Sequence, residues 1–145
     1  MRCNRNSGMK RQATVFLLTL LGAAGCGSTR PTDPGDTGSK AAVLAYFQGI
    51  LRKDWQSVYA MLTPETQKKF SPQRFESQAK VTRLRIGFEP EDVHIRSCEE
   101  NGNDATAHVI LLTKNPTHKR RFVDGITAKR IEGQWRIVLP DNYGR

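Results

Sequence analysis

The spacing of apolar residues changes partway along the chain, and this change limits the fold more than any other feature. After Ser39, apolar side chains recur at helical intervals and form one stripe about two turns long. The stripe consists of Val43, Leu44, Phe47, Ile50 and Leu51. From about residue 84 onward, apolar and polar side chains alternate, which is the period of a strand with one buried face. Helices followed by strands in separate runs predict an α+β domain.

Local signals divide the helical part into four helices. Ser39 can cap the first helix, and Asp54 looks like the N-cap of the second. The predicted core face of this second helix consists of Trp55, Val58, Tyr59 and Leu62. Two short helices are expected to follow, because Thr63-Pro64 and Ser71-Pro72 each place a capping hydroxyl before proline at the first helical position.

The alternating segments predict strands, separated by turn signals. The expected strands are residues 84–88, 93–98, 105–113, 119–131 and 134–139. The segment Asn101–Asp104 is rich in turn-forming residues, and Glu132-Gly133 predicts a tight turn. If that last loop has two residues, the expected facing pairs are Arg130 with Trp135, Ala128 with Ile137, and Ile126 with Leu139.

The first 25 residues have the organisation of an export signal. A basic stretch, residues 1–12, precedes an apolar run, residues 13–25, that ends in small residues. Thirteen residues at about 1.5 Å each cover only ~20 Å of a roughly 30 Å hydrocarbon core, which disfavours a permanent transmembrane helix. We therefore expect residues 1–25 to be a removable signal peptide.

The sequence Ala23-Ala24-Gly25-Cys26 resembles the lipobox of bacterial lipoproteins, although that family usually has leucine where Ala23 stands. The resemblance implies cleavage before Cys26 and lipidation of its thiol. The polar, Gly- and Pro-rich residues 26–38 then form a tether to a domain at residues 39–145. Several acyl chains would anchor the protein stably to the cell membrane or the outer membrane. The alternative is an ordinary secretory signal with an incidental cysteine.

The cysteine count and the net charge limit the disulfides and the partners expected of the mature protein. Cys3 leaves with the signal and Cys26 carries lipid, so Cys98 is the one remaining thiol and no internal disulfide is expected. We expect Cys98 to be an unpaired, half-buried strand residue. The formal charge of +9 falls to +5 after cleavage, because 19 basic and 14 acidic residues remain. This modest charge does not favour nucleic-acid binding.

Residues 46–62 carry a more specific signal. Their sequence, Tyr-Phe-Gln-Gly-Ile-Leu-Arg-Lys-Asp-Trp-Gln-Ser-Val-Tyr-Ala-Met-Leu, resembles the first helix, acidic corner and second helix of the nuclear-transport-factor-like (NTF2-like) superfamily. That superfamily includes SnoaL-like proteins and ketosteroid isomerase. The resemblance covers residues 39–139 and implies a cone-shaped, cystatin-like roll, with N-terminal helices packed on a curved antiparallel sheet. Members use the enclosed pocket for catalysis, ligand binding or protein contacts.

The resemblance to ketosteroid isomerase implies a test for catalysis. That enzyme combines a tyrosine on the first helix with two carboxyl groups, and Tyr46 stands where the tyrosine falls. The corresponding places for the acids read Lys69-Phe70-Ser71 and Ala107-His108-Val109-Ile110. We therefore expect Tyr46 to lack acidic partners and assign no catalytic residue. His94 and His108 are conceivable bases, but strand positions on a half-solvated face explain them more simply.

The remaining candidate residues suggest binding rather than chemistry. Candidate pocket residues are Tyr46, Tyr59, Trp135 and His108; candidate anion-binding residues are Arg121, Lys129, Arg130 and Arg136. Each set also has a simpler explanation, as core aromatics and as a solvated charged face. Metal-ligand spacing is absent from His94, His108 and His118, and we expect no metal or cofactor.

Three functional hypotheses follow. The first is a non-catalytic binding or accessory domain of the cell envelope, anchored to the membrane and in contact with an anionic envelope component or another envelope protein. The second is a small pocket enzyme of isomerase or dehydratase type. The third is a structural subunit that assembles through its sheet, for which a homodimer is the simplest form.

Overall fold

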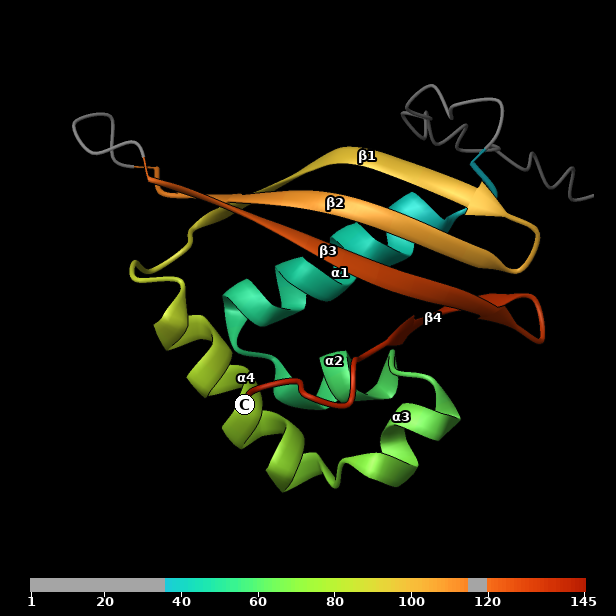
Figure 1. Cartoon of the computed structure of the whole chain (residues 1–145), viewed down its shortest axis with the longest axis horizontal. Coiled ribbons are helices and arrows are strands. Elements are labelled where there is room, and N and C mark those ends of the chain that lie inside the picture. Colours follow the sequence, from blue (N-terminus) through green and yellow to red (C-terminus); the bar gives the residue numbers. More distant parts are fainter. Residues whose placement is uncertain (1–35, 115–119) are drawn as a thin grey trace, which may run out of the picture. The chain divides into compact units, whose positions relative to one another are not determined.

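The computed structural model describes residues 36–114 and 120–145, and within them four helices precede a four-stranded sheet (Figure 1). The helices are α1 (Ser39–Arg52), α2 (Trp55–Ala60), α3 (Pro64–Lys69) and α4 (Pro72–Arg85). The strands are β1 (Asp92–Asn101), β2 (Asp104–Leu112), β3 (Arg121–Ile131) and β4 (Gln134–Val138). The sheet order is β1-β2-β3-β4, and every neighbouring pair is antiparallel. The expected α+β class, with helices followed by a curved, unclosed antiparallel sheet, is confirmed.

The start of α1 differs from the expectation that Ser39 caps it. The N-cap residue is Gly38, whose φ of 110° is accessible to glycine without strain. The Ser39 hydroxyl instead lies 3.2 Å from the Cys98 Sγ atom. The Lys40 N–H donates to Asp36 Oδ1 at 3.4 Å, and the Ser39 N–H donates to Glu100 Oε1 on β1 at 3.3 Å. A cap supplied by a residue so distant in sequence carries no local signal.

The other three helix starts follow the local signals. The Asp54 side chain accepts a hydrogen bond from the Ser57 N–H, at 3.2 Å. Thr63 and Ser71 cap α3 and α4 in the same way, each before a proline at the start of the helix.

Residues 84–88 are not a strand. The helix α4 continues to Arg85, so the last predicted helix is 14 residues long. Its buried face consists of Phe75, Ala79 and Arg83, at intervals of four residues. Because this helical pattern extends to Arg83, the helix continues into the segment where the short alternation of apolar and polar residues predicted a strand. Leu84 is 81 % exposed, which is the opposite of what the strand assignment required.

The sheet has the predicted hairpin at its end. Lys129 pairs with Arg136, Arg130 with Trp135 and Ala128 with Ile137, which confirms the expected two-residue loop. Both loop residues have positive φ, 50° at Glu132 and 78° at Gly133, as a tight hairpin turn of this type requires.

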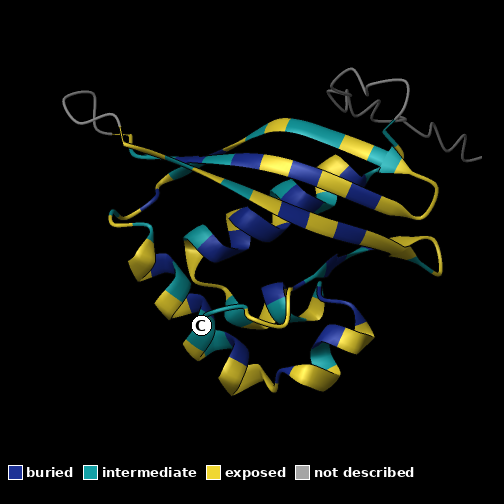
Figure 2. Ribbon diagram, in the orientation of Figure 1, coloured by how far each residue is buried: buried dark blue, intermediate teal, exposed yellow. Residues whose placement is uncertain are grey.

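The helices cover one face of the sheet, and the core lies between them (Figure 1, Figure 2). Alternate residues of β2, β3 and β4 point to this face, including the buried Ala107, Val109, Ala128 and Ile137. The free edge of β4 is closed by residues 61–63, since the Thr63 N–H donates to the Ile137 carbonyl at 2.9 Å. No helix within the described ranges is long and apolar enough to cross a membrane.

Candidate functional site

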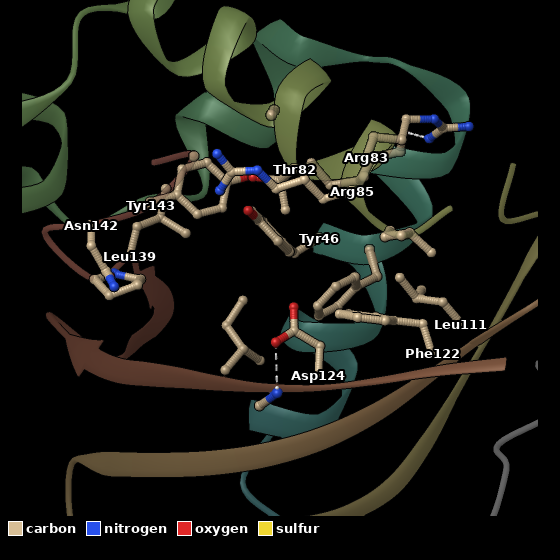
Figure 3. A pocket seen from close by; sticks show the side chains of 18 of the residues that line it. Tyr46, Thr82, Arg83, Arg85, Leu111, Phe122, Asp124, Leu139, Asn142 and Tyr143 are labelled. Carbon is tan, nitrogen blue, oxygen red and sulfur yellow. Dashed lines mark hydrogen bonds between the residues drawn. The ribbon is translucent and has the colours of Figure 1, made fainter. Parts of the chain in front are cut away.

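A pocket of about 280 Å³ lies on the covered face of the sheet, between α1, α4, β3 and the segment 139–145 (Figure 3). Its walls are mainly apolar, and the principal contributors are Phe47, Ile50, Ala79, Leu111, Phe122 and Ile126. Tyr46, Asp124 and Tyr143 add polar groups to this lining. A concave apolar site with a few polar groups is the usual form of a small-molecule site.

Tyr46 reaches the pocket because it belongs to the face of α1 that packs on the sheet. This face also buries Val43, Phe47 and Ile50, and Tyr46 itself is 2 % exposed. Its hydroxyl points into the pocket (Figure 3). Burial raises the pKa of Tyr46 well above its ordinary value, and nearby Tyr143 and Asp124 raise it further. The phenol is therefore neutral at physiological pH, and hydrogen bonding with Tyr143 contributes to this.

Asp124 enters the pocket from the middle of β3. Strand alternation places Phe122, Asp124, Ile126 and Ala128 on the covered face of the sheet. The carboxylate points toward Tyr46 across the pocket (Figure 3), and its Oδ1 accepts a hydrogen bond from the Gly125 N–H at 2.9 Å. Burial raises the pKa of Asp124, while this backbone hydrogen bond offsets part of the rise.

Tyr143 closes the pocket from the segment after β4. Its ring stacks on Phe75, with centroids 6.2 Å apart, and meets Phe70 edge-on at 6.4 Å. Burial raises the pKa of Tyr143, and hydrogen bonding with Tyr46 and Thr82 offsets part of that effect. An ion pair between Lys69 and Asp141, 2.7 Å long, ties the same segment to the end of α3.

The site thus presents a carboxylate and two phenols against mainly apolar walls, and its lining is completed by Thr82, Asn142 and three arginines, Arg83, Arg85 and Arg145. This set can hold a ligand through hydrogen bonds and can also transfer protons. It does not suit a metal ion, since the described residues contain no group of three His, Cys, Asp or Glu side chains arranged to hold one.

Of the four candidate pocket residues, Tyr46 is the one that lines the pocket. The Tyr59 hydroxyl donates to the carbonyls of Gln67 and Phe70, at 3.2 and 2.9 Å, and so ties α2 to α3. The Trp135 indole N–H donates to Thr37 Oγ1 at 3.1 Å. His108 is exposed on the outer face of the sheet, opposite Gly125. Side chains on the outer face cannot reach the pocket.

The expectation that Tyr46 lacks an acidic partner is wrong. Asp124 shares its pocket and acts on its pKa. The acid comes from a different strand than the one compared with ketosteroid isomerase, which is why that comparison did not find it. Tyr143 was also missed, because nothing in its local sequence indicates that residues 140–145 fold back over α4.

The four candidate anion-binding residues do not form one cluster. Arg121 starts β3 and Lys129 lies near its end. At a rise of about 3.4 Å per residue along a strand, the two residues are ~27 Å apart. Arg130 points to the opposite face from Lys129. Lys129 and Arg136 remain as a facing pair, and Arg136 also donates to the Ala60 carbonyl and to Gln134 Oε1.

The other predicted sites have varied outcomes. Cys98 is a half-buried residue of β1 with a free thiol, as expected. His94 is exposed and lies 3.3 Å from the Asp92 carboxylate. Cys26 and His118 lie outside the described residues.

Comparisons with known proteins identify the fold and nothing finer. No protein-family model matches this chain, and no curated protein matches it. Among solved structures, it is similar to a candidate NTF2-like transpeptidase from Campylobacter jejuni, with a TM-score of 0.55 and 13 % identity over 69 % of this chain and 96 % of that one. It is also similar to a SEC-C-motif protein from Rhodopseudomonas palustris, with a TM-score of 0.50 and 14 % identity over 68 % and 73 % of the two chains. The described domain therefore has an NTF2-like α+β fold.

Proposed function

We propose that this chain is a lipid-anchored protein of the bacterial cell envelope whose NTF2-like domain binds a small, largely apolar molecule. The observation that carries the binding function is the 280 Å³ pocket with Tyr46, Asp124 and Tyr143 in its lining. A pocket of this kind, with polar groups converging in an apolar enclosure, is the default site for a ligand.

The polar groups favour a binding site over an imperfectly packed core. An aspartate on the covered face of a strand costs free energy, because burial disfavours its charged form. The neighbouring positions on the same face of β3 are Phe122 and Ile126, so an apolar residue would fit the pattern there. A ligand that pairs with Asp124 would recover this cost.

The anchoring part of the proposal rests on the N-terminal sequence. A signal-like segment, the small residues before Cys26 and the polar tether after it are all typical of bacterial lipoproteins. Such an anchor would hold the domain near the surface of the cell membrane or outer membrane, where it would meet envelope components.

A second candidate function is an isomerase- or dehydratase-type reaction in the same pocket. The observation in its favour is that Tyr46 and Asp124 lie in one pocket, where the charge of Asp124 contributes to the raised pKa of Tyr46. Turnover of a ketosteroid substrate that disappears in both Tyr46→Phe and Asp124→Asn would support this function. Absence of turnover in wild type would leave binding as the function of the site.

The binding function is tested on the mature chain, residues 26–145 with Cys26→Ser, by calorimetry with 1-naphthalenemethanol. The tether is retained because the Thr37 N–H and hydroxyl donate to Glu100, at 3.0 and 2.9 Å. We expect saturable binding that is lost when Ala79→Met fills the pocket wall. The control Val123→Ser, at a 44 % exposed position on the outer face of the sheet, should leave binding unchanged. Equal binding by the filled variant, or no saturable binding of either this alcohol or its amine analogue 1-naphthylmethylamine, would reject the function.

A further inference from the structure

We infer that the molecule bound in this pocket carries a positively charged nitrogen, an amine on an aromatic or aliphatic body, that pairs with Asp124. The inference rests on the proposed binding function and adds the chemical class of the ligand. It follows from the charge that the pocket leaves unpartnered and from the composition of the surrounding walls.

Asp124 has no counter-ion among the residues that the structure describes. Its carboxylate accepts one hydrogen bond, from the Gly125 N–H, and no cation lies within ion-pair distance among residues 36–114 and 120–145. Carboxylates withdrawn from water are normally paired with cations, because an unpaired charge is costly there. Burial raises the pKa of Asp124 and the Gly125 N–H offsets part of that rise; a cation on the ligand would stabilise the charged carboxylate further.

Three arginines line the pocket, and none of them forms an ion pair with Asp124. Arg145 lies near Asp141, whose pKa its charge lowers. Arg83 forms an ion pair with Glu89 and donates to the Ile50 carbonyl at 2.6 Å. Arg85 is exposed at the rim and donates to the Arg145 carbonyl. The two effects that act on Asp124 are burial and the Gly125 hydrogen bond, with no arginine among them. Among residues 36–114 and 120–145, no side chain supplies the cation that the carboxylate lacks, and we assign it to the ligand.

The walls also suit a cation with an apolar body. Four aromatic side chains line the pocket, namely Tyr46, Phe47, Phe122 and Tyr143. Aromatic ring faces attract cations, and the attraction strengthens when water is excluded. The phenol oxygens can accept further hydrogen bonds from an ammonium group. An anionic ligand would face the Asp124 charge, and a neutral one would leave it unpaired.

The test compares two probes of nearly equal size, 1-naphthylmethylamine and 1-naphthalenemethanol, at pH 7 on the mature chain with Cys26→Ser. We expect the amine to bind at least about tenfold more tightly, because hydrogen bonds to charged groups contribute more than the ~1.4 kcal/mol that corresponds to this factor. In Asp124→Asn, which keeps the size of the side chain, the two affinities should become equal within about twofold. The matched control Asp104→Asn, at an exposed position that starts β2, should keep the preference for the amine.

The outcomes separate the two proposals. Equal affinities in wild type, tighter binding of the alcohol, or a preference that survives Asp124→Asn would overturn the amine while leaving the binding function intact. Failure of both probes to bind would reject the binding function and the amine together.

Discussion

The carboxylate of Glu100, near the end of β1, accepts a hydrogen bond of 3.3 Å from the Ser39 N–H and so caps a helix that begins 61 residues earlier in the chain. It also accepts from the Thr37 N–H and hydroxyl, at 3.0 and 2.9 Å. These bonds join the start of α1, the residues before it and the edge strand. Burial opposes the charge, but the hydrogen bonds from Ser39 and Thr37 lower the pKa of Glu100 to about 2.

This arrangement predicts that the contribution of Glu100 to stability depends on pH. The pKa in the folded state, about 2, lies below the ordinary value of 4.5. The stabilisation is therefore complete above pH 4.5 and disappears as the pH falls toward 2. We expect Glu100→Gln to lower the free energy of unfolding by about 1 kcal/mol at pH 7, as for a lost cap, in urea titrations. The difference from wild type should narrow below pH 4.5; a constant difference across this range would contradict the capping role.

A side chain at Gly49 on α1 is predicted to destabilise the domain, because this position packs closely against α2. A Cβ atom at this position would lie 2.4 Å from Cγ2 of Val58, which is fully buried. Alanine usually stabilises a helix interior relative to glycine, but here we expect Gly49→Ala to destabilise the domain by about 1–3 kcal/mol through overpacking. Thermal unfolding of Gly49→Ala alone and combined with Val58→Ala measures the effect. If the cause is the contact, the second substitution costs less in the Gly49→Ala background than in wild type.

Arg83 is predicted to stabilise the domain mainly through backbone carbonyls. It is 8 % exposed and donates to the Ile50 and Leu51 carbonyls at the end of α1, at 2.6 and 3.5 Å. Loss of these bonds in Arg83→Met should cost about 1–3 kcal/mol in denaturant unfolding. Its ion-pair partner Glu89 is largely exposed, so Glu89→Gln should cost less than about 1 kcal/mol. Equal costs for the two variants would assign the stabilisation to the ion pair instead.

The facing pair Lys129 and Arg136 predicts a substitution that stabilises the domain. Like charges directly opposite on neighbouring strands repel each other. Lys129→Glu should therefore raise the free energy of unfolding by ~0.2–1 kcal/mol at low salt, and high salt should remove the gain. If this pair also docks the domain on an anionic envelope component, the same variant should lose salt-sensitive binding to anionic vesicles. Unchanged vesicle binding would leave the charges as a solvated surface.

The proposed anchor predicts the location of the protein in fractionated cells. Wild type should sediment with membranes, and Cys26→Ser should become soluble because the lipid-bearing thiol is lost. Cys98→Ser serves as the matched control, since Cys98 lies on β1 and should not affect anchoring. A wild type that is already soluble, or a Cys26→Ser variant that still sediments, would contradict the lipoprotein assignment.

Local sequence signals determined most of the secondary structure. The apolar stripe after Ser39, the caps at Asp54, Thr63 and Ser71, and the two-residue turn at Glu132-Gly133 all act through neighbours a few residues away. Such interactions are readable from a single sequence, because the chain brings these groups together whatever the rest of it does. The expected strand at 84–88 was wrong since a short alternation competes poorly with a helix that is already capped and packed.

Only part of the pocket could be predicted from the sequence. Within the predicted strand, Asp124 interrupts an apolar alternation of Phe122, Ile126 and Ala128, which is a readable signal for an acid on the buried face. What only the tertiary structure decided is that this acid meets Tyr46 from α1 and Tyr143 from beyond β4 in one enclosure. These elements are distant in sequence, and no local interaction determines how the end of the chain packs on α4. The same holds for Glu100 and Ser39, whose hydrogen bond exists because the sheet brings β1 to the start of α1.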